Sequence, residues 1–249
     1  MSRKQRTLTG YILALGTILA LWQAAAWVLS TQSLPGPLSV AVSFFSQITG
    51  RLAGHFLVSG YRVLVSLVLA LGTAVPFGIA MGRIKGADRL LSPFVYLLYP
   101  IPKIALLPLI LLLFGIGDGS KIFLISFILF FQILVATRDA AREIPREHIL
   151  SMRSLGAGRR QKAIHLVLPA ILPKVLTSLR IGIGTSIAVL FFVESFATSK
   201  GLGFFILDAW SRLDYESMYA GIVGMGLLGV ILYELVEVLD RKLCGWTKI

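Results

Sequence analysis

Long apolar stretches dominate the chain, and charged residues are concentrated in the segments between them. A helix needs roughly 20 consecutive apolar residues to cross the hydrocarbon core of a bilayer, where every backbone N–H and C=O must be satisfied internally. Six stretches reach or approach this length. They cover residues 8–29, 56–82, 93–115, 122–137, 175–196 and 217–239. The pattern predicts an all-α polytopic membrane protein with about six transmembrane helices.

The composition agrees with a protein embedded in lipid. Of the 249 residues, 56% are hydrophobic and 14% are charged, and the mean hydropathy is +0.84. A soluble domain has a more polar surface and a disordered chain has fewer hydrophobic residues, so both classes are excluded. The single cysteine, Cys244, excludes an intramolecular disulfide framework. We therefore expect the bilayer to supply the stabilising environment.

The distribution of basic residues predicts the orientation, since six spans place both termini on one side. Basic residues in loops of the opposite side are Arg51, Lys121, Lys200 and Arg212, and those within spans are Arg62, Lys103 and Arg180. All the other Lys and Arg residues fall on the side of the termini. By the positive-inside rule we expect both termini to be cytoplasmic. The formal charge of +12 then reflects topology, and we expect no nucleic-acid partner.

Prolines interrupt the third stretch, at positions 93, 100, 102 and 108. Each lacks a backbone donor, and a proline within a helix bends or breaks it. Broken helices at membrane depth are tolerated where they line a cavity or are buried in protein. We therefore expect an interrupted span.

The segment 138–174 is a long basic connection between the fourth and fifth stretches. Arginines recur at positions 138, 142 and 146, and carboxylates recur at 139, 143 and 147. This is the spacing of ion pairs along one helix face, and we interpret it as a salt-bridged surface helix rather than a set of metal ligands.

Two short helices are predicted after Pro145. The first ends at the glycines 156 and 158, the second begins in the basic run that follows, and Pro169 is expected to end it. Leu150, Leu155 and Ile164 beside Arg and Lys give this corner a surface suited to a groove on a partner. The alternative is a basic loop that sets topology and touches anionic lipid.

Motifs in this segment resemble a known family. Gly156 and, after nine residues, Leu166-Val167-Leu168-Pro169 are similar to the cytoplasmic signature of inner-membrane permease subunits of binding-protein-dependent ABC importers. Residues 153–157, 168–173 and 179–182 resemble the branch that imports nitrate, sulfonates, taurine and related small anions. Further matches are the sequences at 99–103 (Tyr-Pro-Ile-Pro-Lys), 114–117 (Phe-Gly-Ile-Gly) and 201–203 (Gly-Leu-Gly). The resemblance covers essentially the whole chain, most clearly residues 56–242.

The resemblance implies a coupling helix that docks on a cytoplasmic ATPase. Its residues would be Leu150, Arg153, Ser154, Leu155, Gly156, Ala157 and Arg159. The family signature usually opens with Glu-Ala-Ala, whereas Leu150, Ser151 and Met152 stand here, so the acidic residue is missing. The implied partners are two copies of the ABC ATPase, a second permease copy in a homodimer, an extracytoplasmic substrate-binding protein and the bilayer of a bacterial inner membrane.

The chain lacks the residues of an enzyme. It has no Gly-x-x-x-x-Gly-Lys-Ser/Thr loop to hold a nucleotide, its three histidines are separate, and no Cys/His cluster has metal spacing. We therefore expect no metal, no catalytic residue and no cofactor in this chain. ATP and Mg would be bound by the partner ATPase.

Charged residues within a span are functional candidates because burying them in lipid is costly. Glu194, near the end of the fifth stretch, either helps to gate the pathway or pairs with a buried arginine such as Arg62. Both interpretations stay open. For Arg62 and Arg180, close to span ends, we favour side chains that snorkel to the headgroups over contact with an anion.

Small and polar residues among large apolar ones mark a candidate substrate pathway. The candidates are Gln132 with its neighbour Phe131 in the fourth stretch, and Thr185, Ser186 and Glu194 in the fifth. Helix packing is the default interpretation of any one of them, because small residues let helices approach closely.

The sequence thus predicts three regions: a helix and linker in 1–55, a core permease domain in 56–242 that includes the coupling segment 138–174, and a tail in 243–249. The expected function is the permease subunit of an ATP-driven importer for a small solute, an anion such as nitrate, a sulfonate, taurine or bicarbonate, working by alternating access. The alternatives are an ion-coupled carrier that needs no ATPase and a membrane enzyme acting on lipid. The carrier needs titratable groups within the membrane, and the enzyme needs clustered Asp, His or Glu.

Overall fold

The computed structural model describes residues 3–248, with side chains described within residues 13–246, and every regular element in that range is a helix. The elements are α1 (Arg3–Leu29), α2 (Pro37–Gln47), α3 (Arg51–Arg83), α4 (Lys85–Leu98), η1 (Lys103–Leu106), α5 (Leu107–Phe114), α6 (Asp118–Arg142), α7 (Arg146–Ser154), α8 (Arg159–Lys162), η2 (Ala163–Val167), α9 (Leu168–Glu194), α10 (Leu202–Ser211), α11 (Tyr215–Leu243) and η3 (Gly245–Lys248). The prediction of an all-α protein is confirmed. Four basic side chains used in the orientation argument (Arg3, Lys4, Arg6 and Lys248), and Leu8 at the start of the first predicted span, lie outside the described side chains.

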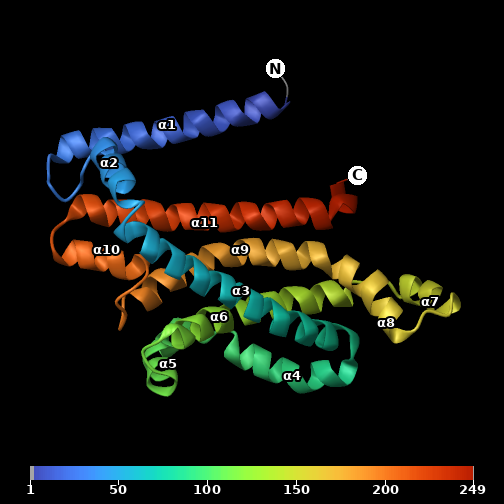
Figure 1. The fold of residues 1–249 in the computed structure, drawn as a ribbon. Helices are drawn as coiled ribbons and strands as arrows, with labels where there is room; N and C mark the ends of the chain where they lie inside the picture. Colours follow the sequence, from blue (N-terminus) through green and yellow to red (C-terminus); the bar gives the residue numbers. More distant parts are fainter. Residues whose placement is uncertain (1–2, 249) are drawn as a thin grey trace.

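The long helices form an elongated bundle (Figure 1). Helices α1, α9 and α11 run nearly parallel to one another, and α3 crosses them obliquely. The connection from α1 to α2 and helix α10 lie toward one end of the bundle, here called the α10 end. Helices α7 and α8 lie toward the opposite end, to which the two chain termini also point. The two ends of the bundle are therefore formed by different elements.

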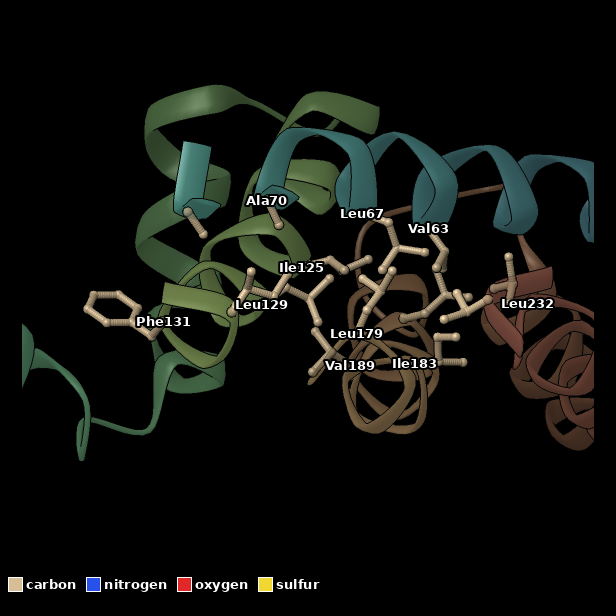
Figure 2. Packing of buried hydrophobic residues seen from close by; sticks show 14 of the residues in the cluster. Val63, Leu67, Ala70, Ile125, Leu129, Phe131, Leu179, Ile183, Val189 and Leu232 are labelled. Carbon is tan, nitrogen blue, oxygen red and sulfur yellow. The ribbon is translucent and has the colours of Figure 1, made fainter. Parts of the chain in front are cut away.

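The core lies where α3, α6, α9 and α11 meet (Figure 2). Leu67 and Ala70 of α3 point toward α6 and α9, where Ile125 and Leu179 face them. All four side chains are at most 6% exposed. The small side chain of Ala70 lets α3 and α6 approach closely, which is how helices associate in lipid.

Much of the outer surface is apolar. Leu57 and Val68 of α3, Leu112 of α5 and Val230 of α11 are each more than half exposed. Such a surface suits a protein whose surroundings are lipid or further protein rather than water.

The number of predicted spans is only partly matched. Among the described residues, α3, α6, α9 with its preceding turns, and α11 are long and apolar enough to cross a membrane, and the bent pair α4 and α5 makes a fifth if it counts as one span. The described apolar part of α1, Leu13–Leu29, is shorter than these. A polytopic membrane protein is therefore supported, while the figure of six is not confirmed.

The interrupted third span is confirmed. Helix α4 ends at Leu98, and the next helical segment, η1 followed by α5, is bent by 83° relative to it. Pro100 and Pro102 lie in the break, and Pro108 lies in the first turn of α5, where its missing N–H costs nothing. Pro93 is accommodated inside α4.

The prediction that Pro169 ends a helix is wrong. Helix α8 continues through a π-helical turn, Ala163–Val167, directly into α9. Residues Arg159–Glu194 thus form one apolar helical segment of 36 residues. Pro169 is compatible with this because it stands in the first turn of α9, after a turn whose hydrogen bonds are already irregular.

The interpretation of 138–147 as one salt-bridged surface helix is also wrong. Helix α6 ends at Arg142 and α7 begins only at Arg146, so the charges do not share a helix face. Arg138 is 5% exposed and pairs with Asp88 of α4 at 2.7 Å, and Arg142 pairs with the same carboxylate. These pairs fasten α4 to α6.

Candidate functional site

The first candidate site is a projection formed by α7, the turn 155–158 and α8, which we call the knob. Gly156 adopts φ +76°, a left-handed conformation that glycine adopts without strain. The N–H of Ala157 bonds to the carbonyl of Met152 at 3.0 Å, and the N–H of Gly156 bonds to that of Arg153 at 3.0 Å. This pair of bonds is a Schellman motif, which ends α7 and turns the chain into α8.

The knob carries the predicted coupling residues on an exposed surface. Leu155 is 82% exposed and Leu150 is 59% exposed. Arg153, Ser154, Gly156 and Arg159 are also exposed, and Ala157 is partly buried. No described side chain covers these two leucines. Large aliphatic side chains that project beside arginines in this way are typical of a surface that a partner covers.

The second candidate site, which we call the ionic cluster, is a group of charged and polar residues at the α10 end, buried except for Asp118. Its members are Ser59 and Arg62 of α3, Asp118 of α6 and Glu194 of α9. Glu194 is fully buried and accepts hydrogen bonds from Arg62 Nη1 at 2.6 Å, Ser59 Oγ at 2.8 Å and the N–H of Gly203 at 3.0 Å. Each carboxylate oxygen therefore has partners, which is the condition for burying an ion pair without a large penalty.

Arg62 joins the helices of the cluster. It is 3% exposed and donates to Asp118 at 2.7 Å, to Glu194 and to the carbonyl of Lys200 at 2.9 Å. The expectation that Arg62 snorkels to headgroups is wrong, because three acceptors are available inside the protein. Of the two interpretations of Glu194, the pairing with Arg62 is present, and a gating role stays a prediction.

Gly201 explains the Gly-Leu-Gly sequence at 201–203. Its φ is +117°, and a Cβ at this position would collide with the Glu194 carboxylate. Its N–H donates to His55 Nδ1 at 3.0 Å, which ties the same loop to α3. The loop after α9 therefore folds back over the buried carboxylate because position 201 lacks a side chain.

Arg180 does not snorkel either. It pairs with Glu237 at 2.6 Å and with Asp240 at 3.3 Å, and its guanidinium lies 5.6 Å from the ring centroid of Tyr233. These partners are all on α11. Arg180 thus holds α9 against α11, and no local sequence pattern indicates this pairing because the partners lie far along the chain.

The predicted pathway residues lie mainly along the interface of α6 and α9. Gln132 Nε2 donates to the carbonyl of Ser178 at 3.4 Å, and Ser186 Oγ bonds to the carbonyl of Gly182 at 2.8 Å. Phe131 is 4% exposed and lies at the edge of the apolar cluster, and Thr185 is exposed (Figure 2). The structure therefore gathers Gln132 and the 182–186 region at one interface. Glu194 lies two turns farther along α9, in the ionic cluster.

Sequence reasoning missed Ser59 and Asp118. Asp118 is an acidic residue at the first position of a helix, which alone has a local explanation in the helix dipole. Nothing local links Ser59 to Glu194. Among the described side chains, no group of three or more His, Cys, Asp or Glu could hold a metal ion.

Known proteins resemble this chain along nearly its whole length. The taurine transport system permease protein TauC of Escherichia coli (strain K12) is 32% identical over 97% of this chain and 90% of its own. The putative aliphatic sulfonates transport permease protein SsuC of Bacillus subtilis (strain 168) is 31% identical over 92% and 84%. The nitrate import permease protein NrtB of Synechococcus elongatus is 27% identical over 87% and 85%.

A solved structure has the same fold. A chain of the MetNI methionine ABC transporter, in an inward-facing conformation, superposes with a TM-score of 0.66 at 20% identity, covering 78% of this chain and 96% of that one. Residues 74–244 match the family described as the binding-protein-dependent transport system inner membrane component. Together with the apolar bundle, this match shows that the chain belongs to that family of ABC importer permeases.

Proposed function

We propose that this permease imports a small anion and that its knob is the contact with an ATPase. The relatives are named for taurine, aliphatic sulfonates and nitrate. The first two carry a sulfonate and the third is nitrate, so each has a small oxygen-rich group with a negative charge. This shared chemistry supports an anionic cargo. The proposed assembly contains two permease copies as a homodimer, two ATPase subunits that bind ATP and Mg, and an extracytoplasmic substrate-binding protein.

The observation that carries the ATPase contact is the exposure of the knob. Leu150 and Leu155 project from a segment rich in arginine, and a soluble partner with an apolar groove would remove both side chains from water. If the knob faces the ATPase, both termini are cytoplasmic in a bacterial inner membrane. The positive-inside rule supports the same orientation.

The continuity of α8 with α9 supports a mechanical route from the knob to the membrane-spanning helices. A helical segment of 36 residues is about 54 Å long at 1.5 Å per residue, so it can carry a displacement of the knob across the membrane. Closure of the ATPases on ATP would move the knob, tilt α9 and alter its contacts with α6 along Gln132, Thr185 and Ser186. The cavity between the two permease copies would then open alternately to the two sides.

Gly156→Asp tests the ATPase contact. No atom lies within 4 Å of a Cβ added at Gly156, so the variant should fold and insert, with a cost of about 1 to 2 kcal/mol for the left-handed backbone. It should abolish substrate-stimulated ATP hydrolysis and uptake in the reconstituted complex, because the new carboxylate lies in the proposed contact.

Gly86→Asp is the matched control. Position 86 also has no atom within 4 Å of an added Cβ, and it lies in the first turn of α4, outside the knob. It should leave coupling unchanged. Normal coupling in Gly156→Asp would overturn the contact, and ion-driven uptake by the permease without any ATPase would favour the carrier alternative.

A further inference from the structure

The break between α4 and η1 exposes irregular backbone within a membrane-spanning pair of helices. Residues 99–102, which include Pro100 and Pro102, are all exposed in the single chain. Irregular backbone does not face lipid, because its polar groups would lack partners there. This face must therefore lie against protein or beside a water-filled pathway. In the proposed assembly, the second permease copy is the protein that faces the break, and the water-filled pathway lies between the two copies.

Lys103 lies at this break and has no acidic partner. Its Nζ donates to the backbone carbonyls of Leu98 at 3.1 Å and Tyr99 at 2.9 Å. No carboxylate among the described side chains forms an ion pair with it. By contrast, the buried arginines 62 and 138 and the partly buried Arg180 each pair with at least one carboxylate.

The surroundings of Lys103 hold the ammonium in place and keep it partly open. The nitrogen lies 4.6 Å from the ring centroid of Phe131 and 5.5 Å from that of Tyr99, so aromatic faces stabilise its charge. Lys121, which also has no ion pair, differs because it is 1% exposed and lies at the α10 end beside Arg62 and Asp118. Among the described basic side chains in the apolar helices, Lys103 combines partial exposure with a charge that no carboxylate neutralises.

We infer that Lys103 is an anion-binding residue of the translocation pathway, which contacts the sulfonate, carboxylate or nitrate oxygens of the cargo as it passes the break. An ammonium has three donors, and neutral carbonyls are weaker partners than an anion, so the cargo can replace one of them. The carbonyls take the nitrogen back when the anion leaves. The inference rests on the proposed function, since it assumes an anionic cargo and a second copy across the break.

The test uses the full complex with its ATPase and binding protein in proteoliposomes, with taurine, methanesulfonate and nitrate as probes. Lys103→Met should lower uptake of the transported anion by about tenfold, the loss expected for one charged hydrogen bond, while assembly and basal ATP hydrolysis persist. Lys85→Met is the matched control, because Lys85 is an exposed lysine at the start of α4, and it should transport normally.

Chemical rescue separates binding from a structural role. In a Cys244→Ser background, Lys103→Cys should lose uptake, regain it after treatment with aminoethyl methanethiosulfonate, which restores a positive charge, and stay inactive after the neutral methyl reagent. Labelling requires that water reaches position 103. If the transported anion binds there, its presence should slow the labelling.

The outcomes are distinct. If the native complex imports none of the three probes with ATP, the proposed anionic cargo fails and the inference fails with it. If the native complex imports one of them and Lys103→Met imports it equally well, only the inference is overturned. Rescue by the neutral reagent would also overturn it.

Discussion

The two ends of the 36-residue helical segment that contains α9 differ in almost every physical property. At the α10 end, Glu194 is fully buried and bonded to α3 and to the first turn of α10. At the other end, the knob projects from the bundle with Leu155 exposed to 82%. One end is fixed by the chain itself, and the other is left without a partner.

This difference indicates which end of α9 moves. Breaking the ionic cluster would leave a buried charge without its partner, so the α10 end resists displacement. The knob makes few contacts that would oppose movement, and its apolar side chains gain from being covered. We expect α9 to pivot near the ionic cluster when the knob is pulled, and the following substitutions test that comparison.

Glu194→Gln should have the largest effect on stability. The amide removes the buried one of the two carboxylates that neutralise Arg62 and leaves only Asp118, which is half exposed, so the cost can approach the roughly 3 to 5 kcal/mol of breaking a buried ion pair. A large drop in the thermal unfolding midpoint in detergent is the expected result. Glu216→Gln, at an exposed position in the first turn of α11, should lower it far less. An unchanged midpoint for Glu194→Gln would contradict the claim that the ionic cluster fixes the α10 end of α9.

Gly201→Ala should have the next largest effect. The backbone at φ +117° is one that essentially only glycine adopts, and the added methyl group collides with the Glu194 carboxylate. Together these cost about 2 kcal/mol or more. The same unfolding measurement applies. Gly119→Ala, which has no atom within 4 Å of its new Cβ, serves as control, and equal midpoints for the two variants would argue against the packed loop.

Lys174→Ala should have the smallest effect. Its ion pair with Glu143 lies near the knob, where the two side chains are 50% and 62% exposed. Exposed pairs contribute less than about 1 kcal/mol and are screened by salt. The unfolding midpoint should stay close to that of the native protein at high ionic strength. A loss as large as that of Glu194→Gln would remove the distinction between the two ends.

The apolar pattern alone is sufficient to predict the long helices and the break at Pro100 and Pro102, because hydrophobic length and missing backbone donors act locally, but it does not predict the short helices α2 and α10. The pattern is less reliable at Pro169, where a π turn allows a helix to continue through residues that usually end one. Helix boundaries also differ from prediction, since α9 begins at Leu168 rather than at residue 175.

Long-range pairing is the part of the site that the sequence does not reveal. Arg62, Arg138 and Arg180 each looked like residues at span ends or on a surface, yet each bonds to a carboxylate more than 45 residues away. Periodicity carries no information about such partners, because they meet only after the helices pack. The proposed coupling residues are contiguous in the chain, so a local motif is enough to propose them, and their role stays a prediction.

Because the π turn at Ala163–Val167 joins α8 to α9 without a break, the direction in which the knob points depends on the number of residues in this connection. Each residue of an α-helix advances the chain by about 100° around its axis. Deleting or inserting one residue between the knob and α9 would therefore rotate Leu150 and Leu155 away from their present direction, even if every helix still formed. The length of this connection therefore sets the direction in which the knob presents these two side chains, and a substitution that keeps the length leaves that direction unchanged.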